Sequence, residues 1–349
     1  MPEPGYHVYS MNSAPESKPS PRRSRLVYWL IALAIAAVLL YFSLRGIEWG
    51  EVWRILSHAD CALVAFGFGI STFALLLRSL RWRVLLRSRA PVDIPTAFWA
   101  TSAGYFGNNF LPARAGELVR TLLVSARSGL TKTFVLTTAL SERLADAIAL
   151  VIISSIVLLT LSVRPGWFDR AAKPFAIIGL CGVFAIAVLP KLEGLFRSLV
   201  MRLPVPPGIR EKLLRVLEQI LIGIRTFHNL GRLSRFIALT VLIWFSDAVG
   251  TIIGMHALGL SASLSVAFLL IAGLGLGSAL PATPGYVGIY QFVAVSVLTP
   301  FGFSRSDAIA YIILAQAIQY VLITFWGLIG LARSRGVNFR AVGAEANRA

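Results

Sequence analysis

Charged residues are scarce in this sequence of 349 residues, and acidic residues are the scarcer kind. Only 14% of the residues are Asp, Glu, Lys or Arg, against about 25% in a typical soluble domain, while 56% are hydrophobic. This composition excludes an ordinary soluble protein and predicts a polytopic membrane protein. The 33 Lys and Arg outnumber the 16 Asp and Glu, but they fall in short runs between apolar segments. That pattern is typical of membrane topology and anionic lipid contact, and we expect no nucleic-acid partner.

Residues that hold metals or form disulfides are also few. The two cysteines, Cys61 and Cys181, and the four histidines are scattered, with neither metal-ligand spacing nor a disulfide framework. No phosphate-binding loop, nucleophile elbow or dinucleotide fingerprint occurs. We therefore expect no metal, no cofactor and no catalytic activity.

The two ends of the chain lack apolar runs. Residues 1–24 are rich in Pro, Ser and charge, cannot bury an apolar face, and are predicted to be a disordered tail. Residues 336–349 form a second tail. The remaining residues, 25–335, are predicted to form one membrane domain.

That domain is expected to consist of two halves, at 60–163 and 236–331, joined by residues 191–235. The connection carries nine basic residues and three acids, so it is expected in the cytoplasm. Its apolar residues recur at helical spacing, which is typical of a helix lying in the membrane interface, or of a cytoplasmic helix packed on another subunit.

Basic residues also predict the orientation of the chain in the cell membrane. The span that begins at Cys61 is expected to end near Leu77, because five arginines without an acid follow it up to Arg89. This places the end of the span in the cytoplasm. The loop 45–60 before it holds more acidic than basic residues and suits the outside. About six spans then leave both termini in the cytoplasm.

The most unusual stretch is 101–120, TSAGYFGNNFLPARAGELVR. Gly and Pro interruptions at membrane depth survive only where the broken backbone is buried in protein or faces a wet cavity. A second copy follows at one constant offset, because Leu111, Pro112, Ala113 and Gly116 recur as Leu280, Pro281, Ala282 and Gly285. Corresponding broken segments in two halves point to the binding site of a transporter. We expect two re-entrant hairpins entering from opposite sides, as an inverted repeat.

Charged side chains near the first break are the main candidates for substrate binding. Each costs roughly 2.5–3.5 kcal/mol at membrane depth on insertion scales, so such groups face a cavity or pair with one another. One reading is that they only attach the hairpin to the next span. The other is that the arginines and a helix N-terminus hold a lipid phosphate. The candidates are Asn108, Asn109, Arg114, Glu117, Arg120, Glu142, Arg143 and Asp146.

The second half offers mainly neutral candidates. Gln316 and Gln319 supply further donors and acceptors, with helix packing as their more common use. Asp247 is an isolated acid within a span. It is a candidate for ion or proton coupling, or for pairing with an arginine of the first half. The second-half substrate-binding candidates are Pro281, Pro284, Gly285, Gly288 and Gln291.

These motifs resemble the flippase-like membrane domain of the lysylphosphatidylglycerol synthetase family. The resemblance covers about residues 26–335 and is strongest at Asn-x-x-x-Pro-x-Arg-x-Gly-Glu-x-x-Arg, at 108–120. Further matches are Arg81-Trp82, Glu142-Arg143 with Asp146, and Pro-x-x-Pro-Gly at 281–285. The chain departs from the family at Gln291, where a glutamate is usual, so no titrating acid is available there.

The resemblance implies lipid handling. In two-domain relatives a soluble aminoacyl-transferase makes a lysyl lipid, which the membrane part moves across the bilayer; no such domain follows in these 349 residues. We expect flipping or transport of a lipid or lipid-linked anionic molecule by alternating access. The first alternative is a non-catalytic membrane partner of a separately encoded glycosyltransferase or lipid synthase. The second is a membrane-embedded transferase acting on polyprenyl phosphate, with Glu142 or Asp146 as base.

Overall fold

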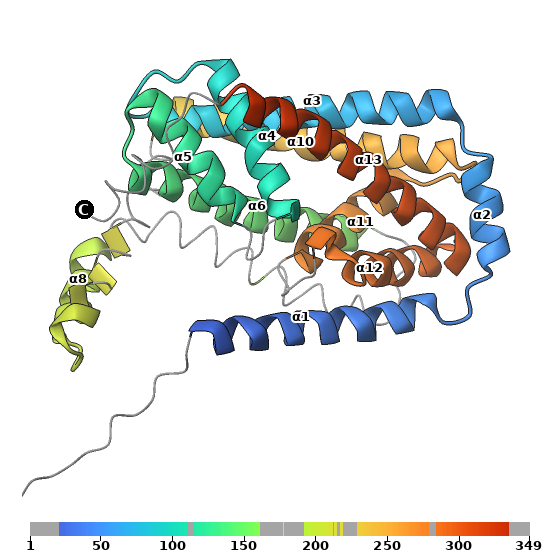
Figure 1. Cartoon of the computed structure of the whole chain (residues 1–349), viewed down its shortest axis with the longest axis horizontal. Coiled ribbons are helices and arrows are strands. Elements are labelled where there is room, and N and C mark those ends of the chain that lie inside the picture. The colour runs from blue at the N-terminus through green and yellow to red at the C-terminus, as the bar shows by residue number, and fades with distance from the viewer. Residues whose placement is uncertain are drawn as a thin grey trace, which may run out of the picture.

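A computed structural model describes residues 21–110, 115–160, 177, 192–211, 213–214, 217–218, 229–278 and 284–334. These residues are mostly helical and contain no β-strand, as expected of an all-α membrane protein. The helices are α1 Pro21–Leu44, α2 Trp49–Ser57, α3 Cys61–Leu86, α4 Ile94–Phe110, α5 Gly116–Ser128, α6 Lys132–Thr160, α8 Glu193–Arg202, α10 Leu230–Ala257, α11 Leu264–Gly277, α12 Ile289–Leu298 and α13 Arg305–Ala332 (Figure 1).

Several expectations lie outside the described residues. These are the tail 1–20, the span predicted near residues 174–189, most of the apolar pattern at 213–224, the tail 336–349, and the site candidates Arg114 and Pro281. Within the connection 191–235 the structure describes α8, which has no buried residue. The helix α1 starts at Pro21 and so includes the last four residues of the predicted tail. The helix α10 starts at Leu230, six residues before the predicted second half.

Within the described part of the chain, three helices are long and apolar enough to cross a bilayer. They are α3, α10 and α13, with 26, 28 and 28 residues and mean hydropathy of 1.9 or 2.0, and a span requires about 20 residues. The end of α1, from Leu33, and α2 form a pair bent by 87° that can count as a fourth span. The expected number of six spans stays a prediction.

The helices of the two halves correspond in order and nearly in spacing. The offset from the start of α3 to the start of α10 equals the offset between Leu111 and Leu280. The offset from α4 to α11 is a single position longer, and those from α5 to α12 and from α6 to α13 are each four positions longer. Even the N-caps correspond, since Asp60 caps α3 and Asn229 caps α10. The predicted offset therefore holds to within one position up to the second break, where additional residues precede α12.

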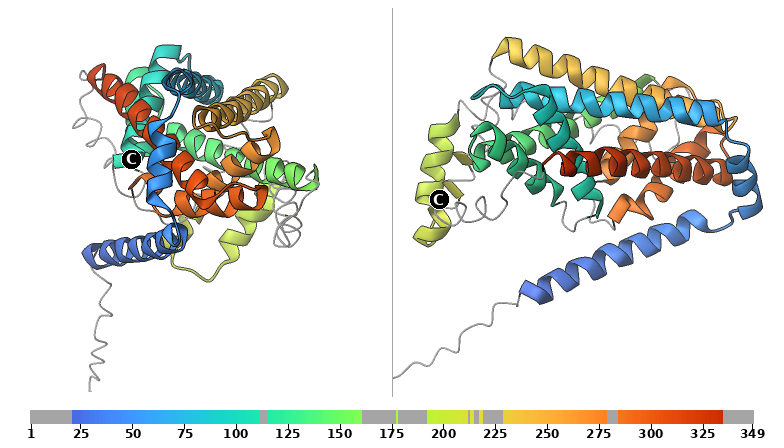
Figure 2. Two further views of the ribbon diagram at one scale, coloured as in Figure 1. Left: turned by 90° about the vertical axis from the view of Figure 1, so that its right-hand side faces the viewer. Right: turned by 45° about the horizontal axis from the view of Figure 1, so that its top comes forward.

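The two halves interlock in opposite orientations. The equivalent helices α3 and α10 share the most extensive contact of any pair and run antiparallel (Figures 1 and 2). At one end Asp60 N–H donates to the carbonyl oxygen of Ala257 at 2.8 Å, and toward the other end Leu85 packs on Phe236. The first helix of each hairpin packs on the last helix of the opposite half, α4 on α13 and α11 on α6. This exchange is the contact pattern of an inverted repeat.

Glycines allow the hairpins to close. In the first hairpin, a Cβ on Gly116 would overlap the carbonyl oxygen of Gly104, so α4 and α5 touch through their backbones. In the second, Gly285 and Gly288 have φ of +69° and +90°, a conformation that favours glycine. A Cβ on Gly288 would also overlap the carbonyl of Ala36, so α1 packs directly against the start of α12.

The helix α3 continues nine residues past the predicted end of its span, to Leu86. The helix is therefore longer than the predicted span, because Arg78, Arg81 and Arg83 are part of it. Arg81 is 1% exposed and Arg78 is partly buried. Two of the five arginines read as a cytoplasmic signal therefore lie inside the protein.

Candidate functional site

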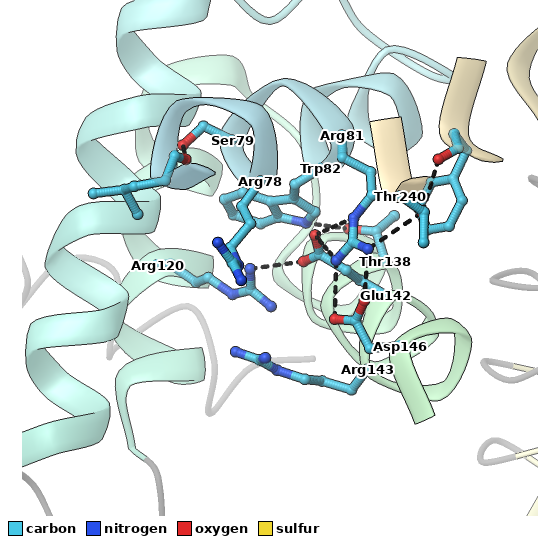
Figure 3. Close-up of polar contacts among 12 residues, drawn as sticks. Arg78, Ser79, Arg81, Trp82, Arg120, Thr138, Glu142, Arg143, Asp146 and Thr240 are labelled. Carbon is cyan, nitrogen blue, oxygen red and sulfur yellow. Dashed lines mark hydrogen bonds and ion pairs between the residues drawn. The ribbon is translucent and has the colours of Figure 1, made fainter. Parts of the chain in front are cut away.

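A buried carboxylate, Glu142 on α6, joins the helices of the first half. Its Oε1 accepts from Nη2 of Arg81 on α3 at 3.1 Å, and its Oε2 accepts from Nη1 of Arg120 on α5 at 3.0 Å. Asp146, one turn further along α6, accepts from both terminal nitrogens of Arg81 at 2.5 and 2.9 Å (Figure 3). The arginine is thus held by two carboxylates on one helix face.

A second carboxylate, Glu117 at the start of α5, extends the cluster toward α4 and α6. One oxygen accepts from Arg143 Nη2 at 2.7 Å and from Asn108 Nδ2 at 3.2 Å, and the other accepts from Arg120 Nε at 2.5 Å. Together these side chains form what we call the ionic network, which is electrically neutral. Its members are Arg81, Arg120, Arg143, Glu117, Glu142 and Asp146.

Aromatic rings complete the burial of the network. The guanidinium of Arg120 lies 4.5 Å from the ring centre of Trp82, whose indole N–H donates to Thr138 Oγ1 at 3.2 Å. Arg81 lies 5.1 Å from the ring centre of Phe236. Both arginines are only 1% exposed, so neither can contact a ligand without a rearrangement of the helices. Their role in this structure is to hold α3, α5 and α6 together.

A cavity of about 510 Å³ lies between the two halves and borders the network. Its volume is within the range of roughly 300–1,000 Å³ that is usual for small-molecule sites. Its first-half wall is polar and charged, and Arg143 is the most accessible network member there, with a side chain 39% exposed. The polar residues of this wall are Ser71, Arg78, Tyr105, Asn108, Asn109, Arg143 and Asp146.

The second-half wall of the cavity is aromatic and mostly uncharged. Tyr286 and Tyr290 stack with ring centres 4.8 Å apart and an interplanar angle of 9°. Tyr286 has φ of +60°, an uncommon conformation for a non-glycine residue. Gln319 on α13 is exposed toward the same space. The one acid of the second half at this cavity, within the described residues, is Asp247.

The second break is held by a chain of neutral hydrogen bonds. Gln291 Oε1 accepts from Gly288 N–H at 2.7 Å, and its Nε2 donates to Gln316 Oε1 at 2.7 Å. Gln316 Nε2 in turn donates to the carbonyl oxygen of Gly285 at 2.9 Å. These bonds satisfy backbone groups that the break removes from helical pairing, so Gln291 fixes the shape of the backbone that borders the cavity.

The structure thus brings most first-half candidates into one place. Asn108, Glu117, Arg120, Glu142, Arg143 and Asp146 form one connected cluster, and Asn109 lines the cavity beside it. Gly285 also lines the cavity, whereas Gly288 and Gln291 lie behind it. Pro284 begins a short 3-10 turn at the break. Asp247 pairs with Arg78 of the first half, one of the two roles considered for it.

Sequence reasoning overlooked two arginines. Arg81 and Arg78 were counted as topology signals, although Arg81-Trp82 belongs to the motif that carries the family resemblance. The spacing of Arg78 and Arg81 was a further signal that both face the protein interior, because residues three positions apart lie on the same face of a helix. Among the described residues, no group of three or more His, Cys, Asp or Glu could hold a metal ion.

These features define a multi-pass membrane protein of two inverted helical halves around a polar cavity. The sequence matches the family described as lysylphosphatidylglycerol synthase TM region over residues 29–327. The chain belongs to this family, which confirms the resemblance inferred from the motifs.

Three relatives illustrate the range of the family. The chain is 25% identical to a protein of Haloferax volcanii named glycosyltransferase AglD, over 91% of this chain and 56% of that protein. It is 24% identical to a UPF0104 membrane protein of Methanothermobacter thermautotrophicus, over 88% of this chain and 93% of the relative. It is 22% identical to the UPF0104 membrane protein PH1989 of Pyrococcus horikoshii, over 88% and 97%. The chain therefore spans little more than half of AglD but nearly all of the other two.

Proposed function

We propose that this protein moves a lipid or lipid-linked molecule with an anionic head group across the cell membrane by alternating access. The observation that carries the proposal is the cavity of about 510 Å³ between two inverted halves, with ionised side chains in its wall. Inverted repeats place substrate sites at the interface of the repeats, near the middle of the bilayer. Ionisable side chains at that depth are rare, and they usually line substrate or ion paths. Both termini lie in the cytoplasm in this proposal.

In this mechanism the head group enters the cavity while the acyl or prenyl chains stay in the bilayer. Arg143, the most exposed cation of the ionic network, contacts the anionic group, and Asn108 and Asn109 donate to its oxygens. Arg120 was expected to contact phosphate too. Because Arg120 is buried and paired with Glu117 and Glu142, it acts instead as a positioning residue for the hairpin.

A vesicle assay tests the proposal. Purified protein is reconstituted into liposomes that carry phosphatidylglycerol labelled on one acyl chain with a dithionite-sensitive fluorophore. Dithionite outside the vesicles bleaches only the outer leaflet, so protein-dependent movement appears as bleaching beyond half of the signal. Arg143→Gln is expected to reduce the rate about tenfold, the loss of one charge-assisted contact of about 1.5 kcal/mol. Arg87→Gln, at an exposed arginine on the end of α3, is the matched control.

The substrate need not be phosphatidylglycerol, so a labelled polyprenyl phosphate is assayed in parallel. Movement of either probe at wild-type rates by Arg143→Gln would show that this arginine does not contact the head group. If the wild-type protein moves neither probe, translocation of an anionic lipid is refuted.

A second candidate function follows from the name of one relative, glycosyltransferase AglD. We propose as the alternative that the chain is a membrane partner of a separately encoded glycosyltransferase or lipid synthase. Stable co-purification with such an enzyme, together with absence of lipid movement, would favour it. A transferase that uses Glu142 as base is disfavoured, because this carboxylate is buried between Arg81 and Arg120. Asp146, 18% exposed, is the remaining candidate base, and product formation by the purified protein would test it.

A further inference from the structure

An ion pair outside the ionic network links the two halves at the cavity. Arg78 on α3 and Asp247 on α10 lie 2.5 Å apart, Nη2 to Oδ2, and both line the cavity. Their side chains are 22% and 21% exposed, so each is accessible from the cavity. By contrast, Arg81 and Arg120 are enclosed. Arg78 and Arg143 both belong to the described cavity wall, so a ligand in the cavity can reach either arginine.

The two residues of this pair are equivalent positions of the repeat. They are 169 residues apart, the same offset that separates the starts of α3 and α10. Along the antiparallel contact, Ile70 lies beside Gly250 and Arg81 beside Thr240. Arg78 thus meets its own counterpart near the middle of the contact, which is where a two-fold axis relating the halves must pass.

A position on that axis is the same distance from the entrances of both halves. A group there can hold a ligand whichever side of the protein is open, as alternating access around one fixed site requires. The repeat has a cation at one copy of this position and a carboxylate at the other. In this structure the two groups pair with each other, so the site is electrically neutral.

The chemistry of the pair indicates what replaces the carboxylate. The guanidinium of arginine forms paired hydrogen bonds with phosphate as well as with carboxylate. A phosphate ester that enters the cavity can take the place of Asp247 on Arg78, while the displaced carboxylate turns to the cavity. The other charged groups that face this space are Asp146 and Arg143 on α6, and both already have partners in the ionic network.

We propose that Arg78 is a second phosphate-binding residue of the cavity, beside Arg143, and that Asp247 occupies the place of the phosphate on Arg78 in the absence of a ligand. The part of this site in lipid movement rests on the proposed function, but binding can be tested by itself. Competition by Asp247 lowers the affinity for phosphate, which allows release of the head group on the far side. Asp247 is then a built-in competitor, and its removal strengthens binding.

Calorimetry on the purified full chain tests this with geranyl phosphate as the probe. Geraniol has the same chain without charge, and inorganic phosphate has the charge without the chain. Asp247→Asn is expected to bind geranyl phosphate about tenfold more tightly than wild type, and Arg78→Gln about tenfold more weakly, the effect of gaining or losing one close charge pair. Binding of geraniol is expected to be the same in all variants. Glu51→Gln, which removes an exposed acid that does not line the cavity, controls for net charge.

The opposite signs separate this role from a structural one. If the pair only stabilised the fold, both substitutions would weaken binding, and equal or weaker binding by Asp247→Asn overturns the proposal. Arg78→Lys is the second variant, since it keeps the charge and loses the paired geometry. It is expected to bind geranyl phosphate several-fold more weakly while leaving geraniol unaffected. Inorganic phosphate bound as tightly as geranyl phosphate would overturn the assignment to a lipid-linked phosphate.

The two proposals fail in different ways. Tighter binding by Asp247→Asn with no lipid movement in vesicles leaves the phosphate site standing and refutes translocation. Lipid movement by the wild type, with binding unchanged by either substitution, refutes the phosphate site and leaves translocation standing.

Discussion

Gly116 faces the carbonyl oxygen of Gly104 so closely that a Cβ at this position would overlap it. The contact joins the two helices of the first hairpin and brings Glu117 beside Asn108. Gly116→Ala is therefore expected to destabilise the protein by roughly 1–3 kcal/mol, the usual cost of overpacking. Thermal unfolding in detergent measures it. Gly69→Ala, on an exposed face of α3 with open space around it, is the control and is expected to be neutral or slightly stabilising. If Gly116→Ala and Gly69→Ala unfolded at the same temperature, the close contact between α4 and α5 would not contribute to stability.

Removal of the charge on Glu142 leaves two buried arginines without their shared partner. Glu142→Gln is expected to lower the free energy of unfolding by about 3–5 kcal/mol, because breaking a buried pair leaves an uncompensated charge. Arg120 keeps Glu117 and Arg81 keeps Asp146, so the lower end of that range is expected. Chemical unfolding monitored by tryptophan fluorescence measures the effect. Glu51→Gln, which breaks the exposed pair with Arg54 on α2, is expected to cause no detectable change.

Substitutions of two glutamines in the second half are expected to have different effects, one on stability and the other on transport. Gln291→Leu leaves Gly288 N–H without its acceptor and Gln316 Oε1 without its donor, at a cost of about 1–3 kcal/mol for buried groups. Gln319→Leu alters only the exposed wall of the cavity, so it is expected to keep the melting temperature and to slow lipid movement. Melting curves and the vesicle assay, applied to both variants, test this. A Gln319→Leu protein that transports normally would show that the head group does not contact this wall.

The orientation of the chain can be measured by cysteine labelling of intact cells. In a background of Cys61→Ser and Cys181→Ser, Ser57→Cys is expected to react with a membrane-impermeant maleimide from outside. Ser234→Cys, near the start of α10, is expected to react only after permeabilisation. Both serines are exposed, and both expectations follow from the basic residues at the cytoplasmic ends. Reaction of Ser234→Cys in intact cells would invert the proposed topology.

The repeat could be predicted from four residues and their spacing, but its exact extent could not. The echo of Leu111, Pro112, Ala113 and Gly116 predicts two halves at a single offset, and the starts of α3 and α10 fit that offset. The additional residues before α12 could not be predicted, because the repeated residues end at Gly285. Only the backbone conformation shows that Gly285 and Gly288 form a turn, whereas the equivalent Gly116 starts a helix.

The polar cluster could be predicted in its composition but not in its connections. Charged residues in an apolar context predict partners, and spacing places Glu142 and Asp146 on one helix face. The partner of both, Arg81, is 61 and 65 residues away in sequence. Local periodicity carries no information about such a contact. For Asp247 the sequence likewise predicted only two alternatives, ion coupling or a pair with an arginine of the first half, and did not identify Arg78 as the partner.

Gly288 and the carbonyl of Ala36 tie the second hairpin to a helix that belongs to neither half. In a molecule made of two equal halves alone, the inward-open and outward-open forms would be degenerate in energy. The packing of α1 against α12 removes that degeneracy, since movement of the second hairpin must break a contact that movement of the first does not. In the proposed transport cycle, α1 therefore contributes to the choice of ground state from outside the repeat, and changes in α1 are expected to alter the resting population of the two forms without touching the cavity.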